Sequence, residues 1–121
     1  MTMQAGKTHV GIGILAAAAL VLTALAVPAT ARADAASVAA GAALYKEKCI
    51  GCHAADGSGN APMGKALKAG DLRTAQIQGK KDAELAAAIT NGKGKMPAQK
   101  GLSAAQVSQI LDYVRTLGKA K

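Results

Sequence analysis

The sequence predicts an all-α protein. Between residues 103 and 117, apolar side chains recur at the spacing of one helix face: Val107, Ile110, Leu111, Val114 and Leu117. A shorter stretch over residues 82–90 repeats this spacing with Leu85, Ala88 and Ile89. No run of β-branched or aromatic residues would form a sheet, and the chain has no Phe and no Trp.

Residues 1–33 have the layout of a secretory signal peptide. Lys7 gives a positive start, and residues 10–27 are almost entirely apolar or small. Ala31-Arg32-Ala33 then matches a small-x-small cleavage site. We therefore expect a cleaved leader, a periplasmic or otherwise exported protein, and a single domain over residues 34–121. An uncleaved membrane anchor is the alternative, because the apolar run is nearly long enough to span a bilayer.

The domain is expected to open with a helix over residues 38–49, for which Ser37 is a candidate N-cap. Leu44 and Tyr45 fall at helical spacings along it. Gly41 is costly inside such a helix, by about 1 kcal/mol relative to alanine. A close contact with another helix would explain why glycine stands there.

The segment that follows is interpreted as mostly irregular. Residues 54–62 are rich in Asp, Gly, Ser and Asn, which predicts turns. Residues 65–68 are compatible with one short helical turn, and residues 71–79 are interpreted as a connector.

Two further helices have clear boundaries. The helix over residues 82–90 is expected to be capped by Asp82 and ended by Asn91-Gly92. The last helix is expected to begin at Ser103, with Gln106 three residues later completing a capping box.

Cys49-Ile50-Gly51-Cys52-His53 is the motif that carries chemistry. A C-x-x-C-H run is typical of a covalent attachment site for c-type haem. The cysteines lie about one helical turn apart, so both sulfurs can reach one porphyrin edge and form thioethers. His53 would then bind the iron from one face. The motif predicts one covalent haem c held by Cys49, Cys52 and His53.

Two other interpretations of the motif compete. A structural zinc site needs about four ligands of the Cys or His type, but the only other histidine, His9, lies in the expected leader. A thioredoxin-like redox pair belongs beside a βαβ pattern, which the sequence lacks. A haem-free thiol pair of Cys49 and Cys52 stays open as an alternative.

The composition favours haem independently of the motif. Tyr45 and Tyr113 are the only aromatic residues, and alanine supplies much of the apolar content. A domain of this size buries little apolar surface, and it often needs an additional cross-link or bound group for stability. A haem would supply the missing apolar bulk.

The chain after residue 33 resembles a small class I cytochrome c. Besides the C-x-x-C-H motif, the resemblance rests on three further segments: Asp56-Gly57-Ser58-Gly59-Asn60-Ala61-Pro62, Gly92-Lys93-Gly94-Lys95-Met96-Pro97 and Tyr113-Val114-Arg115. It implies three to five short helices and loops wrapped round one covalently attached haem. It also implies that Gly41 and Tyr45 on the first helix pack against Ile110 and Tyr113 on the last.

The same resemblance implies the remaining contacts of the haem. The carbonyl of Pro62 would accept a hydrogen bond from the free ring nitrogen of His53. Met63 lies beside Pro62, on the side expected to support His53, whereas Met96 lies in a separate loop stiffened by Pro97. We therefore predict Met96 as the second iron ligand and Met63 as a filler of the core or pocket.

These features predict an exported one-electron carrier that is not an enzyme. A methionine opposite a histidine fills both axial positions, which favours electron transfer over oxygen chemistry. Two alternatives stay open. One is a haem-bearing subunit of a larger dehydrogenase or oxidase, and the other is a ligand-sensing or peroxidatic haem protein in which Met96 leaves the iron.

Charge suggests the kind of partner. Residues 34–121 keep 13 of the 15 Lys and Arg residues against 7 Asp and Glu, a formal charge of +6. We expect redox proteins with acidic docking surfaces as partners, no nucleic acid, a monomeric state, and membrane contact only through a retained leader. Five lysines would form a rim around the haem edge, unless they are simply a solvated face: Lys46, Lys48, Lys93, Lys95 and Lys100.

Overall fold

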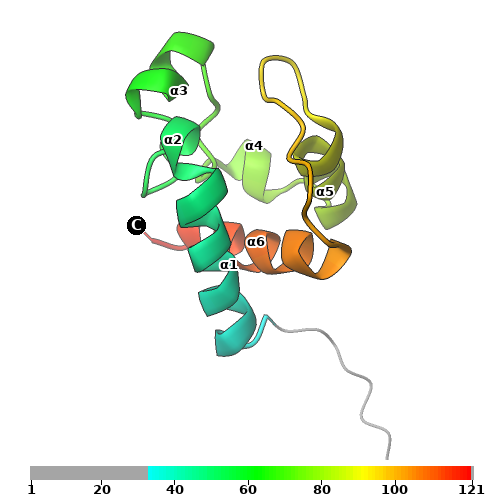
Figure 1. The fold of residues 1–121 in the computed structure, drawn as a ribbon. Helices are drawn as coiled ribbons and strands as arrows, with labels where there is room; N and C mark the ends of the chain where they lie inside the picture. The colour runs from blue at the N-terminus through cyan, green and yellow to red at the C-terminus, as the bar shows by residue number, and fades with distance from the viewer. Residues whose placement is uncertain (1–32, 121) are drawn as a thin grey trace, which may run out of the picture.

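The computed structural model describes residues 33–120, so the expected leader lies outside the described residues except for Ala33. In this range the chain forms six helices and no strand, which confirms the all-α class (Figure 1). Two of the six have only four residues each. The helices are α1 (Ala35–Lys48), α2 (Ile50–His53), α3 (Pro62–Leu67), α4 (Ala75–Gln78), α5 (Asp82–Asn91) and α6 (Ala104–Leu117).

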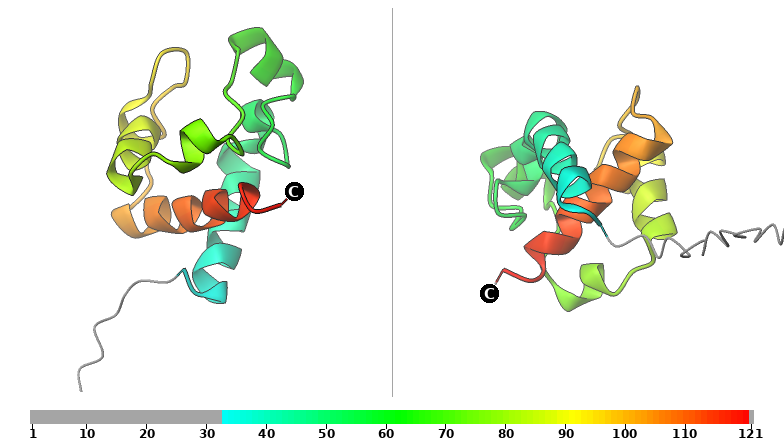
Figure 2. Two further views of the ribbon diagram at one scale, coloured as in Figure 1. Left: turned by 180° about the vertical axis from the view of Figure 1, so that it is seen from behind. Right: turned by 90° about the horizontal axis from the view of Figure 1, so that it is seen from below.

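The other helices are arranged around α6. In Figure 1, α1 crosses α6 near the base of the molecule, and α5 packs against α6 on the other side. The α2–α3 pair and the loop after α5 stand on opposite sides above α6. Seen from behind, α4 lies between them (Figure 2). No helix among the described residues is both long and apolar enough to cross a membrane.

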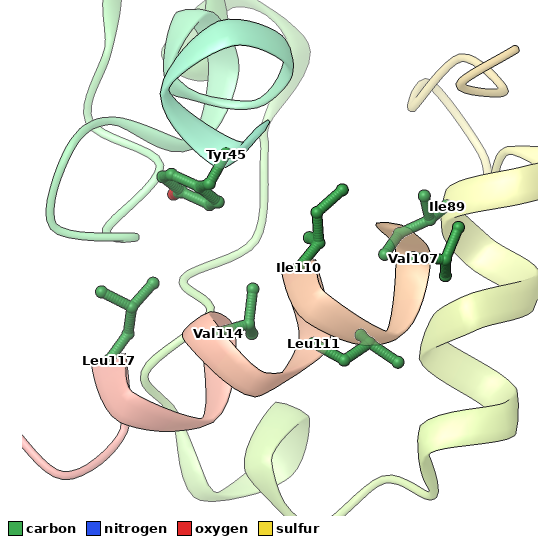
Figure 3. Packing of buried hydrophobic residues seen from close by; sticks show 7 residues of the cluster. All are labelled: Tyr45, Ile89, Val107, Ile110, Leu111, Val114 and Leu117. Atoms are coloured by element: carbon green, nitrogen blue, oxygen red, sulfur yellow. The ribbon is translucent and has the colours of Figure 1, made fainter. Parts of the chain in front are cut away.

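The predicted apolar face of α6 forms the core. Its five side chains are all buried together with Tyr45 and Ile89, as Figure 3 shows. Tyr45 and Ile110 are the most deeply buried large side chains, at 2% and 1% exposure. The capping box at the start of α6 is present, because Ser103 N donates to Gln106 and Gln106 N donates to the Ser103 hydroxyl.

α1 and α6 approach most closely at Gly41. A Cβ atom on Gly41 would lie 1.8 Å from the backbone oxygen of Gln109, so only glycine fits this crossing. One turn further along α1, the ring centroid of Tyr45 lies 5.1 Å from that of Tyr113. These contacts confirm the close helix packing expected around Gly41 and Tyr45.

The predicted N-cap of α1 is wrong. Asp34 caps the helix, because its carboxylate accepts a hydrogen bond from Ser37 N at 2.6 Å. The Ser37 hydroxyl donates instead to the carboxylate of Asp112 on α6. The helix therefore starts earlier than expected, and Ser37 joins it to α6.

The predicted N-cap of α5 is also wrong. Lys81 occupies the cap position, and its N–H donates to the carboxylate of Glu84 at 3.1 Å. Asp82 is the first helical residue, and its carboxylate accepts from Arg115 Nη2 at 2.6 Å. Arg115 Nη1 also donates to Gln78 O at 2.7 Å. Asp82 therefore joins the start of α5 to α6 rather than capping its own helix.

Two short helices lie where mostly loop was expected. α3 begins at Pro62, ahead of the turn predicted over residues 65–68, with proline at the helix start that its fixed φ suits. α4 forms inside the expected connector, where the Thr74 hydroxyl accepts from Ile77 N at 3.4 Å. A helix of four residues is too short to show a periodic pattern in the sequence.

The α1–α6 crossing yields a stability prediction. Gly41→Ala should destabilise the haem-loaded protein by at least about 2 kcal/mol, because the new methyl group forces two backbones apart. Gly51→Ala is the matched control, since a Cβ on Gly51 meets nothing within 4 Å. Both variants replace a helical glycine with alanine, so the intrinsic helix propensity changes in the same direction in each. Chemical denaturation followed by circular dichroism measures the difference, and equal midpoints would contradict the packing argument.

Candidate functional site

The C-x-x-C-H residues lie where α1 meets α2, on the wall of a cavity of about 370 Å³. Cys49 N donates to Tyr45 O at 2.8 Å, and His53 N donates to Cys49 O at 2.9 Å. Helical hydrogen bonding therefore continues through the motif. It turns Cys49, Cys52 and His53 toward the same cavity.

The cysteine environment counts against a redox-active thiol pair. Both cysteines are free and half-buried. Burial, and then the neighbouring Cys52, raise the pKa of Cys49 to about 11. Redox-active cysteines have thiol pKa values below the ordinary one instead. Cys49 therefore remains a protonated thiol near neutral pH unless it is covalently modified.

The zinc alternative also fails on geometry. Across residues 33–120, no three His, Cys, Asp or Glu side chains come together as a metal-binding group. A structural zinc site needs about four such ligands. The motif therefore lacks the partners that would complete a zinc site.

His53 has a half-buried ring that lines the cavity. Its Nδ1 atom is buried and has no hydrogen-bond partner among the described residues. Burial lowers the pKa of His53, and the backbone of Gly70 opposes this shift. The ring is therefore neutral near neutral pH, which is the form that binds metals. Pro62, expected to accept from this ring, makes no such bond here and is exposed at the start of α3.

The backbone around His53 is held tightly. Ala54, the next residue, has φ 62° and ψ 167°, a region that normally admits only glycine. The Tyr45 hydroxyl donates to the Ala54 carbonyl at 2.8 Å and helps to hold this conformation. On the other side, a Cβ on Gly64 would lie 1.9 Å from Cys52 O, so α3 packs directly on α2. Strained and close-packed backbone of this kind clusters at functional sites.

Met96 comes to the same cavity from a distant segment. It lies in the loop between α5 and α6 and is partly buried on the cavity wall. Met63 does not reach the cavity, and its side chain is 55% exposed on α3. The prediction that Met63 fills the core or pocket is therefore wrong. The structure brings together Cys49, Cys52, His53 and Met96 and leaves Met63 outside.

The rest of the wall is mostly apolar. Its side chains come from α3 to α6 and the segments between them: Leu67, Leu72, Ile77, Leu85, Ile89, Ile110, Leu111 and Val114. The cavity has the size and apolar lining of a cofactor site. Two thiols, one imidazole and one thioether are the groups that attach and ligate a c-type haem. On one apolar wall, these four side chains fit that group.

Five lysines line this cavity, but only three of them belong to the five that the sequence predicted. Lys48, Lys93 and Lys95 line it, whereas Lys46 and Lys100 are exposed and do not. Two lysines that the sequence analysis missed, Lys68 and Lys80, also line it. Lys68 ends α3 in a left-handed conformation, and Lys80 follows α4, so their positions depend on the two short helices that were not foreseen.

Two of these lysines are partly neutralised. Lys48 Nζ lies 2.7 Å from Glu47, and Lys80 Nζ lies 3.8 Å from Glu84. Glu84 is the only acidic residue among those that line the cavity. The cavity wall therefore keeps an excess of positive charge.

Comparisons with known proteins identify relatives of this chain. The family model described as "Cytochrome C oxidase, cbb3-type, subunit III" matches residues 36–114. A cytochrome c6 from Picosynechococcus sp. is 43% identical over 89 residues, which cover 68% of this chain and 74% of the relative. A cytochrome c6 from Leptolyngbya boryana is 41% identical over 81 residues, covering 65% of this chain and 91% of the relative.

A larger protein also shares the domain. The cbb3-type cytochrome c oxidase subunit FixP of a Bradyrhizobium species is 34% identical over 85 residues. The match covers 69% of this chain but only 28% of FixP. The same kind of domain therefore also occurs within a longer oxidase subunit.

Proposed function

The chain belongs to the cytochrome c family, and on that premise we propose that it is a one-electron carrier with histidine and methionine as iron ligands. Members of the family carry covalently attached haem c and transfer electrons. We assign the two thioether bonds to Cys49 and Cys52, and the axial positions to His53 and Met96. The observation that carries this assignment is that these four side chains, from two separate segments, line one apolar cavity.

Each residue has a distinct task in this proposal. Cys49 and Cys52, at the α1–α2 junction, would attach the haem, and His53 would bind its iron. Met96 would supply a neutral thioether ligand, which raises the reduction potential. When bound, the haem supplies reversible one-electron chemistry of iron.

Pro62 is the proposed hydrogen-bond acceptor for His53. A ligating histidine usually donates its second ring N–H, which fixes its orientation. His53 Nδ1 is buried without a partner, and Pro62 begins the helix that packs on α2.

We propose a free carrier rather than a fixed subunit or an enzyme. Filled axial positions leave no open site for a substrate on the iron. The two cytochrome c6 relatives are matched over most of their length, whereas FixP is matched over about a quarter of its own. Co-purification with a large oxidase or dehydrogenase would favour the subunit alternative.

An acidic redox protein is the proposed partner. Lys48, Lys68, Lys80, Lys93 and Lys95 line the cavity, and these five form the lysine rim of the site. Lys93 and Lys95 are exposed on the loop that carries Met96. Charges placed at the point of electron transfer raise the encounter rate with an oppositely charged partner.

The iron ligand can be tested with two methionine variants. Met96→Ala should keep the covalent haem, lose the weak charge-transfer band of a Met-ligated ferric haem, lower the potential and bind carbon monoxide when reduced. Met63→Ala is the control and should keep the band, with stability within about 0.5 kcal/mol of wild type because its side chain is exposed. If the charge-transfer band persists in Met96→Ala, the assignment of Met96 as the iron ligand is wrong.

The lysine rim can be tested with small redox probes of opposite charge. Oxidation of the reduced protein by ferricyanide should slow as salt rises, and oxidation by the cation tris(phenanthroline)cobalt(III) should not, because salt screens the attraction over about 10 Å at 0.1 M. Lys95→Glu should reduce the effect of salt on the rate of ferricyanide oxidation. Lys119→Glu, an equal charge change outside the cavity, should reduce it less. Equal effects would favour a merely solvated lysine face.

We also propose that residues 1–33 are a leader removed on export, as the order of charged, apolar and small residues indicates. Intact-mass measurement of the exported protein should give an N-terminus at Asp34 and one added haem. Retention of Met1 would instead show that the apolar segment anchors the carrier to the membrane. A mass without haem would contradict the proposed function itself.

A further inference from the structure

The loop that carries Met96 is fixed by a small number of backbone bonds. Lys93 N donates to Met96 O, and Met96 N donates to Lys93 O, both at 3.0 Å. Gln99 N donates to Ile89 O on α5 at 2.8 Å. The position of the Met96 sulfur therefore depends on how residues 92–99 turn, since no helix or strand holds this segment.

Gly92 is the tightest point of that turn. Its φ of 79° and ψ of 165° lie in a region that is essentially restricted to glycine. A Cβ atom on Gly92 would lie 2.7 Å from Met96 O and 2.9 Å from Ala98 N. Both neighbours are backbone atoms of the loop, so neither can move without shifting Met96.

We propose that Gly92 is a positioning residue for the Met96 ligand. It lets the chain leaving α5 pass directly beneath the backbone of residue 96, which sets how far the Met96 side chain reaches into the cavity. From the sequence, Gly92 was expected to end a helix and to begin the Gly92-Lys93-Gly94-Lys95-Met96-Pro97 segment that resembles the family's ligand loop. The proposal rests on Met96 being an iron ligand.

The same loop contains two matched controls. Gly94 and Gly101 also have positive φ, at 58° and 80°, but a Cβ on either one meets nothing within 4 Å. An alanine Cβ at either position would contact no backbone atom of Met96, although Gly94 lies inside the Lys93–Met96 turn and Gly101 lies outside it. Comparison with Gly92 therefore separates contact with the Met96 backbone from the general cost of replacing a glycine that has positive φ.

The test compares four single variants of the haem-loaded protein: Gly92→Ala, Gly94→Ala, Gly101→Ala and Met96→Ala. Gly92→Ala should keep covalent haem and the helical far-UV signal. It should lose most of the charge-transfer band and bind carbon monoxide when reduced, as Met96→Ala does. Gly94→Ala and Gly101→Ala should keep the band. The double variant Gly92→Ala with Met96→Ala should bind carbon monoxide as Met96→Ala does alone, because both changes act on one ligand.

The possible failures are distinct. If Met96→Ala keeps the band, the ligand assignment fails and the role of Gly92 falls with it. If Met96→Ala loses the band but Gly92→Ala keeps it, the positioning role alone is overturned. If Gly92→Ala loses helical signal, or melts below Met96→Ala, the residue serves the whole fold and the proposal is also overturned.

Discussion

The contact of two backbones at Gly41 governs where the site can form. α1 ends directly before the C-x-x-C-H motif, and α6 supplies Ile110, Leu111 and Val114 to the cavity wall. Because a Cβ on Gly41 would overlap Gln109 O, the helices can cross this closely only with glycine at that point. The crossing therefore holds the C-x-x-C-H motif close to the part of the cavity wall that α6 supplies.

Core and cofactor site share the same side chains. Tyr45, Ile89, Ile110, Leu111 and Val114 are buried core residues and also line the cavity. Apolar burial is the main favourable term in folding, and this small domain has few large side chains to supply it. A ligand that binds only the folded state adds its binding free energy to stability. The haem thus completes the core as well as the redox centre.

Sequence reasoning succeeded where a pattern is long and repeated. The face of α6, its capping box and the glycine at the helix crossing follow from periodicity and local chemistry, and the structure confirms them. Sequence reasoning failed where contacts between residues distant in the chain decide the role of a side chain. Asp82 was expected to cap a helix, but its carboxylate binds Arg115, which is distant in sequence.

The predictions for the site divide in the same way. The motif was named from its residue types and spacing, and Met96 from its separate loop and the family resemblance; the structure places all of them on one cavity wall, and their roles toward haem remain proposals. Lys68 and Lys80 could not, since short helices with no periodic signal bring them to the cavity. Met63 was misplaced because its sequence position beside Pro62 does not show that α3 turns it toward solvent.

The two sides of the cavity are supported in different ways. His53 stands on α2, which is pressed against α3 at Gly64 and held through Ala54 by the Tyr45 hydroxyl. Met96 stands on a turn closed mainly by its own backbone bonds. Helix packing is shared with the whole core, whereas a turn can change with little effect on the rest of the fold. On the proposed ligation, the histidine side is therefore the fixed frame of the site, and the methionine side is where this fold would tune the iron.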